Sequence, residues 1–275
     1  MIRQAEPAGR PLLAAAIVEL LRSRGPALVA LSGGVDSSAV ASLARDALGE
    51  DVVAATVTNS SVSSREVESA RRAASAIGVR HRLIPAEPLE DAQYRTNGAD
   101  RCFRCRSVET KALLEVGVAE GVAQYLDGIH VDDLGDERPG IRAMDSAGFF
   151  HPFLWARWKK TDVRRYARSV GLPNWDRPSN ACLASRVARG EALSRELFAT
   201  IDRAEGLLLD RGFRRVRVRV QGDAARVEVE RSETARLAEG TLRRELTERL
   251  LALGFRSVSF DREGFRPRGE LPVLR

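Results

Sequence analysis

The chain has 275 residues, enough for one large domain or for a large domain and a small one. Its hydrophobic content of 44% supports a packed core, and no apolar run approaches the ~20 residues that span a bilayer, so we expect no membrane partner. The net charge of +6 is compatible with phosphorylated substrates and with RNA, and does not separate the two.

Along the first half of the chain, strand patterns alternate with helix patterns. Helical spacing of apolar residues predicts helices at 12–24, 37–48, 65–77 and 105–120. Short apolar runs predict strands at 27–31, 52–58, 80–84 and 124–127. This alternation predicts an α/β fold with a parallel sheet, whose ligands bind at the carboxyl ends of the strands.

The second half changes character. We predict loops at 132–148 and 172–190, separated by a helix at 161–170 with Thr161 as its N-cap. Beyond them we predict a helix at 194–211, a hairpin of strands 213–220 and 226–229, a helix at 241–253 and a strand at 257–260. The sequence therefore predicts an α/β domain over residues 1–190 and a small α+β domain over residues 191–275.

A Gly- and Ser-rich turn, Ser32–Ser38, lies between the first predicted strand and the following helix. Such a turn exposes backbone N–H groups to a phosphate, and serines add hydroxyl donors. The candidate ATP-binding residues are Ser32, Gly33, Gly34, Asp36, Ser37 and Ser38. Asp36 is placed to hold Mg²⁺, or alternatively only to complement the positive end of the helix. The turn lacks the Lys of the P-loop; it resembles the PP-loop of ATP pyrophosphatases, which implies cleavage of ATP to AMP and pyrophosphate.

The chain has three cysteines, an odd number that argues against a disulfide framework. The N-terminus is charged and has no apolar signal region. Together with the cysteine count, this predicts a cytoplasmic protein. Cys102 and Cys105 form a C-x₂-C pair, which serves zinc, iron–sulfur clusters and redox chemistry alike, and Cys182 is the third cysteine. Three cysteines would hold a 4Fe–4S cluster with one open iron. Sulfur chemistry without a cluster, a zinc site and a purely structural role remain the alternatives.

Four further segments resemble the LarE family of ATP-dependent sulfur transferases. They are 97–105, 127–143, 178–186 and 217–229, and the third, Pro-Ser-Asn-Ala-Cys-Leu-Ala-Ser-Arg, is the most specific. The resemblance implies a PP-loop fold related to the adenine nucleotide alpha hydrolases. It also implies that the enzyme adenylylates a carboxylate of a pyridinium biscarboxylate mononucleotide. Sulfur then displaces AMP to give a thiocarboxylate, a step in nickel-pincer cofactor biosynthesis.

The resemblance also implies roles for particular residues. Some members sacrifice a Cys sulfur, whereas others deliver sulfide from a 4Fe–4S cluster held by three Cys; this chain is similar to the second kind. The catalytic candidates are Cys182, Asp36, Ser185 and Arg186, and the cluster ligands are Cys102, Cys105 and Cys182. Glu205, Arg217 and Arg219 are expected to bind the substrate. Arg217 and Arg219 alternate on a predicted strand, so they share one face, where guanidinium groups bind phosphate.

A tRNA thiolase is the main alternative, since it also combines a PP-loop with cluster-binding cysteines. It predicts RNA binding with a steep salt dependence and an added RNA-binding module. The predicted α+β domain does not resemble such a module, so we expect a small-molecule mononucleotide substrate and no nucleic acid. The resemblance further implies a homo-oligomer that uses ATP and Mg²⁺.

Overall fold

The computed structural model describes residues 12–134, 139–238 and 240–265. Within them the chain forms two compact units. Unit 1 comprises 12–59, 64–88 and 102–179, and unit 2 comprises 60–63, 89–101 and the residues from 180 onward. The boundary expected at residue 191 therefore lies inside unit 2. The preceding loop packs with that unit because the Ala188 N–H donates to the Val220 carbonyl at 3.0 Å.

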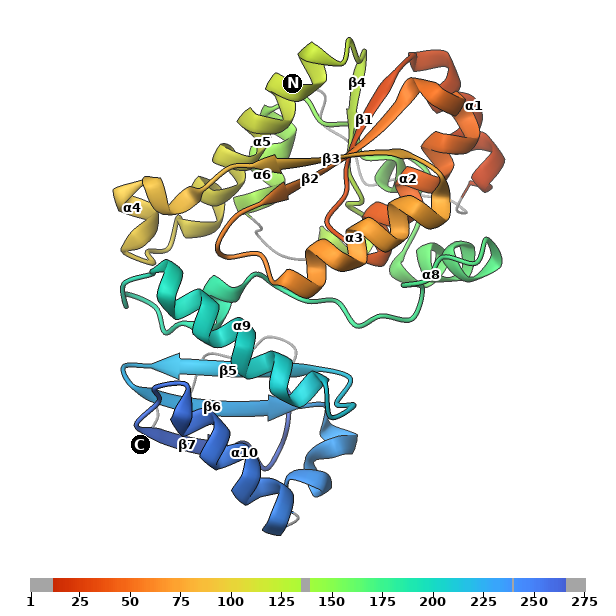
Figure 1. Cartoon of the computed structure of the whole chain (residues 1–275). Helices are drawn as coiled ribbons and strands as arrows, with labels where there is room; N and C mark the ends of the chain where they lie inside the picture. The colour runs from red at the N-terminus through yellow and green to blue at the C-terminus, as the bar shows by residue number, and fades with distance from the viewer. Residues whose placement is uncertain (1–11, 135–138, 239, 266–275) are drawn as a thin grey trace. The chain divides into compact units, whose positions relative to one another are not determined.

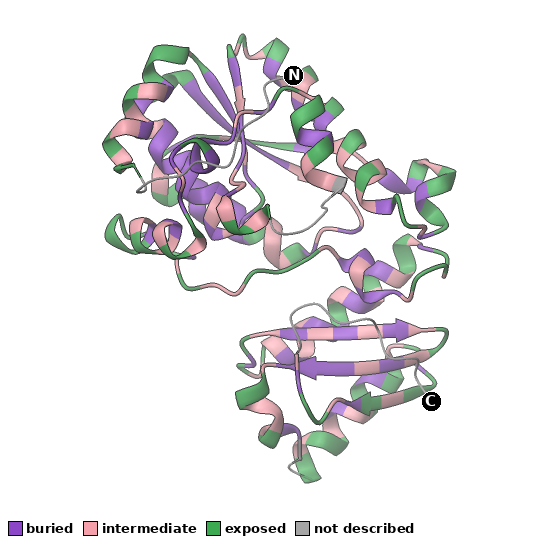
Figure 2. Ribbon diagram, turned by 180° about the vertical axis from the view of Figure 1, so that it is seen from behind, coloured by how far each residue is buried: buried purple, intermediate pink, exposed green. Residues whose placement is uncertain are grey.

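Unit 1 contains the expected parallel sheet (Figure 1). Its strands are β1 (Ala27–Ala30), β2 (Val52–Thr58), β3 (Arg80–Pro85) and β4 (Gln124–Leu126). They lie in the order β3-β2-β1-β4, and every neighbouring pair is parallel. Central β1 and β2 are largely buried, whereas edge strand β3 is mostly exposed (Figure 2).

Helices cover both faces of this sheet. On one face lie α1 (Ala14–Arg24), α2 (Val35–Leu48), α3 (Ser64–Ile77) and α8 (Lys160–Ser169). On the other lie α5 (Arg101–Ala119) and α6 (Pro139–Ser146). Alternate residues of a strand point to opposite faces, so Val29 packs with the first group and Leu28 with the second.

Three local expectations differ from the structure. The loop expected at 132–148 contains α6, which buries Met144 against Phe149. Helix α5 begins at Arg101, so its first turns include both Cys102 and Cys105. Helix α8 has Lys159 as its N-cap instead of Thr161, because the Asp162 carboxylate accepts the Lys159 N–H at 3.0 Å.

The short helices complete the described structure. They are α4 (Ala92–Arg95), α7 (Pro152–Trp155) and the 3-10 turns η1 (Gly49–Asp51), η2 (Pro88–Glu90), η3 (Val131–Asp133), η4 (Leu183–Arg186) and η5 (Arg231–Ala238). Among the described helices, none combines the length and apolar character that a membrane crossing requires.

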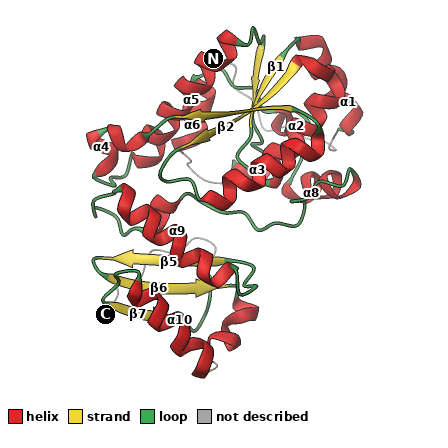
Figure 3. Ribbon diagram, in the orientation of Figure 1, coloured by secondary structure: helices red, strands yellow, loops and turns green. Residues whose placement is uncertain are grey.

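Unit 2 is built on a three-stranded sheet with helices beside it (Figure 3). Its strands are β5 (Val216–Gln221), β6 (Ala224–Val229) and β7 (Ser257–Phe260), and its main helices are α9 (Arg195–Leu209) and α10 (Gly240–Ala252). β5 and β6 form the expected antiparallel hairpin, and β7 runs parallel to β6.

The two faces of this sheet differ in chemistry. Val218 faces Val227 across the hairpin, and both side chains are fully buried. The alternate positions carry charge, because Arg217 faces Glu228 and Arg219 lies next along the same strand. One face of the sheet thus belongs to the core of unit 2, and the other presents an arginine-rich surface.

Candidate active site

The phosphate loop, residues 32–38, joins β1 to α2 in unit 1. The Ser37 hydroxyl accepts the Ser32 N–H at 3.0 Å, and the hydroxyls of Ser37 and Ser38 donate to the Gly34 carbonyl at 3.1 and 3.0 Å. Gly34 is the N-cap of α2 and makes no side-chain cap hydrogen bond. The first N–H groups of the helix are therefore available to an anion. Ser37 and Ser38 are buried, so their hydroxyls shape the loop.

The Gly33 peptide is fixed by three donors. Its carbonyl accepts from Ser69 Oγ at 2.8 Å, Asn174 Nδ2 at 2.9 Å and Arg177 Nη1 at 3.4 Å. Gly33 has a φ of +84°, and a Cβ there would lie 2.3 Å from the Glu66 carbonyl oxygen. Arg177 also binds both Glu66 oxygens, at 2.7 and 3.0 Å. A side chain at residue 33 would thus displace α3 and open the loop.

The turn after β4 packs directly against the phosphate loop. A Cβ on Gly128 would lie 2.6 Å from the Asp36 carbonyl carbon and 2.7 Å from the Ser37 nitrogen, so only glycine fits. The carboxyl ends of β1 and β4 thereby meet at one place, as expected for ligand binding in a parallel sheet.

The two carboxylate oxygens of Asp36 differ in their contacts. Its Oδ2 forms an ion pair with Lys160 Nζ, whereas the adjacent Lys159 is the N-cap of α8. Its buried Oδ1 has no hydrogen-bond partner among the described residues, and His130 Nε2 is 3.8 Å away. A buried carboxylate oxygen without a partner is unfavourable unless a ligand completes it. The Asp36 carboxylate would therefore suit Mg²⁺, which prefers oxygen ligands.

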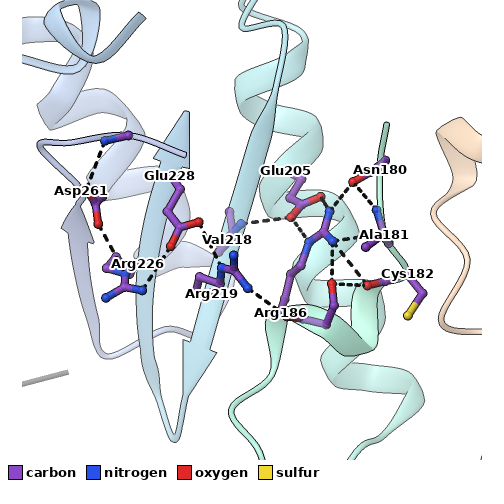
Figure 4. A network of polar contacts seen from close by, with 12 residues as sticks. Asn180, Ala181, Cys182, Arg186, Glu205, Val218, Arg219, Arg226, Glu228 and Asp261 are labelled. Carbon is purple, nitrogen blue, oxygen red and sulfur yellow. Dashed lines mark hydrogen bonds and ion pairs between the residues drawn. The ribbon is translucent and has the colours of Figure 1, made fainter. Parts of the chain in front are cut away.

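Unit 2 holds the surroundings of Cys182 (Figure 4). The guanidinium of Arg186, which is 0% exposed, binds both Glu205 oxygens at 2.7 and 3.0 Å. It also donates to the Ala181 carbonyl at 2.9 Å and to Asn180 Oδ1 at 2.7 Å. Arg186 therefore gathers the residues that precede Cys182 around one buried ion pair.

The remaining contacts fix the Cys182 backbone and leave its sulfur outside the network. The Ser185 hydroxyl donates to the Cys182 carbonyl at 2.8 Å, and Figure 4 shows the sulfur directed away from Arg186. Glu205 is occupied further, because its Oε1 accepts the Val218 N–H at 3.0 Å. In this structure Arg186, Ser185 and Glu205 hold the cysteine loop in place.

Arg217 and Arg219 differ in how they are paired. Arg219 donates to Glu228 Oε2 and to the Ser185 carbonyl, both at 3.1 Å. Arg217 makes no hydrogen bond or ion pair to any described residue, and its guanidinium stacks 4.2 Å from the Phe265 ring centroid. Burial, and after it the charges of Arg186 and Arg219, lower the pKa of Arg217 to about 10, which leaves it a cation at neutral pH. A half-buried guanidinium without an anionic partner is suited to bind a phosphate.

The other two cysteines lie on α5. Cys102 and Cys105 are three residues apart on this helix, so they are neighbours on its surface, and both thiols are half-buried. Cys182 belongs to unit 2. Across the described ranges, no group of three or more His, Cys, Asp or Glu side chains is arranged to hold a metal ion. The three-cysteine ligand set therefore stays a prediction.

Sequence reasoning missed a pair of residues that supports the cysteine loop. Asn97 is fully buried with a φ of +56°, and its Nδ2 donates to the Ala188 carbonyl at 2.7 Å. Arg101 Nη1 donates to Asn97 Oδ1 at 2.6 Å and to the Ala184 carbonyl at 2.8 Å. The Asn97-Gly98 dipeptide signals a turn, but no local pattern connects it to residues far along the chain.

The chain is similar in sequence to one protein family model and to three known proteins. The asparagine synthase family model matches residues 8–102. A protein of Lactiplantibacillus plantarum named pyridinium-3,5-bisthiocarboxylic acid mononucleotide synthase is 34% identical over 254 residues, which is 92% of this chain and 91% of that protein. An uncharacterized protein of Synechocystis sp. is 35% identical over 87% of this chain and 90% of its own length. A second uncharacterized protein, from Methanocaldococcus jannaschii, is 25% identical over 62% of this chain and 66% of its own length.

Proposed function

Because the chain belongs to the LarE family of ATP-dependent sulfur transferases, we propose that it converts a carboxylate of a pyridinium biscarboxylate mononucleotide to a thiocarboxylate, within nickel-pincer cofactor biosynthesis. The name of the Lactiplantibacillus plantarum relative, a pyridinium-3,5-bisthiocarboxylic acid mononucleotide synthase, supports this substrate class. The observation that carries the proposal is the phosphate loop, with its uncapped helix N-terminus and the unpartnered oxygen of Asp36.

In the first half-reaction, the substrate carboxylate attacks the α-phosphorus of ATP. A new P–O bond forms, the bond to the bridging oxygen breaks, and pyrophosphate leaves with its electron pair. The N–H groups of residues 35–37 bind phosphate oxygens, and Lys160 adds a positive charge beside Asp36. Asp36 would hold Mg²⁺, which supplies charge neutralisation for the departing pyrophosphate.

In the second half-reaction, sulfur attacks the carbonyl carbon of the acyl adenylate. The C–O bond to AMP breaks and AMP departs, which a free carboxylate oxygen cannot do as readily. We propose that Cys102, Cys105 and Cys182 hold a 4Fe–4S cluster that supplies bound sulfide. The two neighbouring thiols on α5 fit this donor set, and the Cys182 sulfur lies outside the Arg186 network.

We propose that the substrate phosphate binds at Arg217, with Arg219 beside it. Arg217 supports this role because its guanidinium forms no salt bridge with a described carboxylate, and Glu228 and Glu205 act on it only through their charges. Arg186 and Glu205 support it indirectly, since their buried ion pair shapes the loop that carries Cys182.

The function is tested by incubating the anaerobically purified protein with ATP, Mg²⁺ and the biscarboxylate mononucleotide. We expect AMP, pyrophosphate and a product whose mass shows exchange of one oxygen for sulfur. A parallel reaction with bulk tRNA tests the thiolase alternative. Thiolated tRNA, with no AMP released on the mononucleotide, would overturn the proposal.

The sulfur source is tested on the same preparation. A cluster predicts broad visible absorbance and about four irons per chain, both lost in a Cys102→Ser/Cys105→Ser variant. If Cys182 itself gives up its sulfur, the intact mass falls by one H₂S after turnover and iron is not required. An iron-free wild-type protein that loses this mass would contradict the cluster.

The resemblance also implies a homo-oligomer, which we propose for this enzyme. Light scattering coupled to gel filtration measures its mass directly. A single-chain mass at assay concentration would contradict this part of the proposal.

A further inference from the structure

A buried histidine lies between two carboxylates near the end of β4. His151 Nδ1 lies 2.7 Å from Asp127 Oδ1, and His151 Nε2 lies 2.7 Å from Asp145 Oδ1. The imidazole is 1% exposed, whereas the Asp145 side chain is 56% exposed. Asp127 directly follows β4, Asp145 belongs to α6, and His151 immediately precedes α7.

This arrangement requires a charged imidazole. A neutral ring has only one N–H, so one of its nitrogens would face a carboxylate oxygen with no proton between them. Burial by itself lowers the pKa, but the hydrogen bonds and charges of Asp127 and Asp145 outweigh it and raise the pKa of His151 to about 9. At neutral pH both ring nitrogens therefore donate.

The histidine acts on the backbone through Asp127. The same Asp127 Oδ1 that binds His151 accepts the Ile129 N–H at 3.0 Å, which closes a turn around Gly128. Gly128 is the residue whose backbone presses on Asp36 and Ser37 of the phosphate loop. A second anchor holds the same segment, because the Phe150 N–H donates to the Tyr125 carbonyl at 2.8 Å.

We propose that His151 is a positioning residue for the phosphate loop. As an imidazolium it holds Asp127, and Asp127 holds the turn around Gly128. That turn sets where Asp36 and Ser37 present their groups to ATP. This inference rests on ATP binding at the loop and does not depend on the identity of the sulfur acceptor. It assigns a role in nucleotide binding to a side chain that does not itself belong to the loop.

The proposed role of His151 predicts that ATP affinity depends on pH. The charged groups that act on His151 are Asp127 from the end of β4 and Asp145 from α6, while α7 has no charged residue. The adjacent Phe150 ring is covered by the Arg24 guanidinium at 4.3 Å. Loss of the His151 proton would remove the positive charge that compensates the buried Asp127 carboxylate and would so loosen the turn. ATP affinity should then fall by about tenfold, the usual effect of one charge-assisted hydrogen bond.

Asp145→Asn is the sharpest test, because Asp145 is half-exposed and its removal should not unfold the chain. An asparagine keeps the hydrogen-bond acceptor and removes the charge, which should lower the His151 pKa by about one unit. We expect the alkaline loss of ATP affinity, measured by calorimetry without acceptor substrate, to shift to lower pH by the same amount. Asp51→Asn, an exposed residue of η1, is the matched control and should behave as wild type.

The ring itself can be observed, since the chain has only three histidines. Long-range ¹H–¹⁵N spectra titrated with pH report the His151 protonation directly. A His151→Gln variant should bind ATP about tenfold more weakly at neutral pH and should no longer show the alkaline step. A neutral ring at pH 7, or a shifted His151 pKa with an unshifted ATP profile in Asp145→Asn, would overturn the inference. Failure of sulfur transfer alone would not affect it.

Discussion

Asp36 has one carboxylate oxygen paired with Lys160 and one buried oxygen that no described residue hydrogen-bonds. We expect Asp36→Asn to lower the rate of pyrophosphate release by about a hundredfold or more, because the amide cannot hold a metal beside the departing phosphates. Pyrophosphate release measured over a range of Mg²⁺ concentrations checks this. Asp46→Asn, an exposed substitution on the same helix, serves as the control. An unchanged Mg²⁺ dependence in Asp36→Asn would show that the carboxylate only complements the helix end.

Arg217 and Arg215 both stack on Phe265, but within the described residues only Arg215 of the two forms a salt bridge, with Glu230 at 3.4 Å. We expect Arg217→Gln to raise the KM for the mononucleotide by about tenfold or more, since a charge-assisted phosphate contact is lost. The KM for ATP should not change. Arg215→Gln is the matched control on the same ring. Equal effects of the two substitutions on the mononucleotide KM would remove Arg217 from the phosphate site.

For individual residues, the sequence predicted which residue types belong to the site. It predicted their contacts less well. The phosphate loop could be recognised from its Gly and Ser spacing. Lys160 could not be separated from Lys159, because the answer depends on where α8 begins, and that is set by the Asp162 carboxylate. Glu205 stays a predicted substrate-binding residue, but its ion pair with Arg186 depends on long-range packing and could not be predicted.

Among the elements, η4 carries the residues that follow Cys182, and Arg101 supports it from a distant segment. Arg101→Lys keeps the charge but loses Nη1, the guanidinium nitrogen that donates to both Asn97 Oδ1 and the Ala184 carbonyl. We expect it to cost about 1–3 kcal/mol of stability and to increase the rate at which iodoacetamide modifies Cys182, measured by peptide mass spectrometry. Arg203→Lys, at an exposed position of α9, is the control. If the modification rate of Cys182 stays at the wild-type value, Arg101 does not position that loop.

Elements with a strong period were predicted from the sequence, and elements defined by tertiary contacts were not. The hairpin of β5 and β6 was evident because Val and Arg alternate over its strands and a Gly-Asp turn joins them. Helix α6 was missed because its surroundings are rich in Asp, Gly and Pro, and its burial depends on Phe149. Residues 89–101 contain no signal for belonging to unit 2, since their partners lie near residue 188.

The pKa shifts of two histidines predict how the stability of the whole molecule depends on pH. The pKa of His151 rises from 6.5 to about 9 on folding, so its contribution is complete below pH 6.5 and is lost as the pH rises through 9. The loss should reach about 3 kcal/mol of unfolding free energy. Burial, with the charge of Arg71, lowers the pKa of His81, so that residue destabilises the fold as the pH falls below 6.5. Urea denaturation at a series of pH values measures both effects, and the alkaline decrease should vanish in His151→Gln.

The division of the chain between its units affects how it can be synthesised. Unit 2 takes residues 60–63 and 89–101 from the first half of the chain, but its sheet is formed only by residues after 215. During translation these early segments leave the ribosome long before their packing partners exist. Asn97 is made long before its partner Ala188. A chain that ends at residue 190 still lacks the sheet of unit 2, with which residues 60–63 and 89–101 form one unit. Folding of unit 2 is thus expected to finish after chain release, and a protein cut near residue 190 should expose residues 60–63 and 89–101 to proteases.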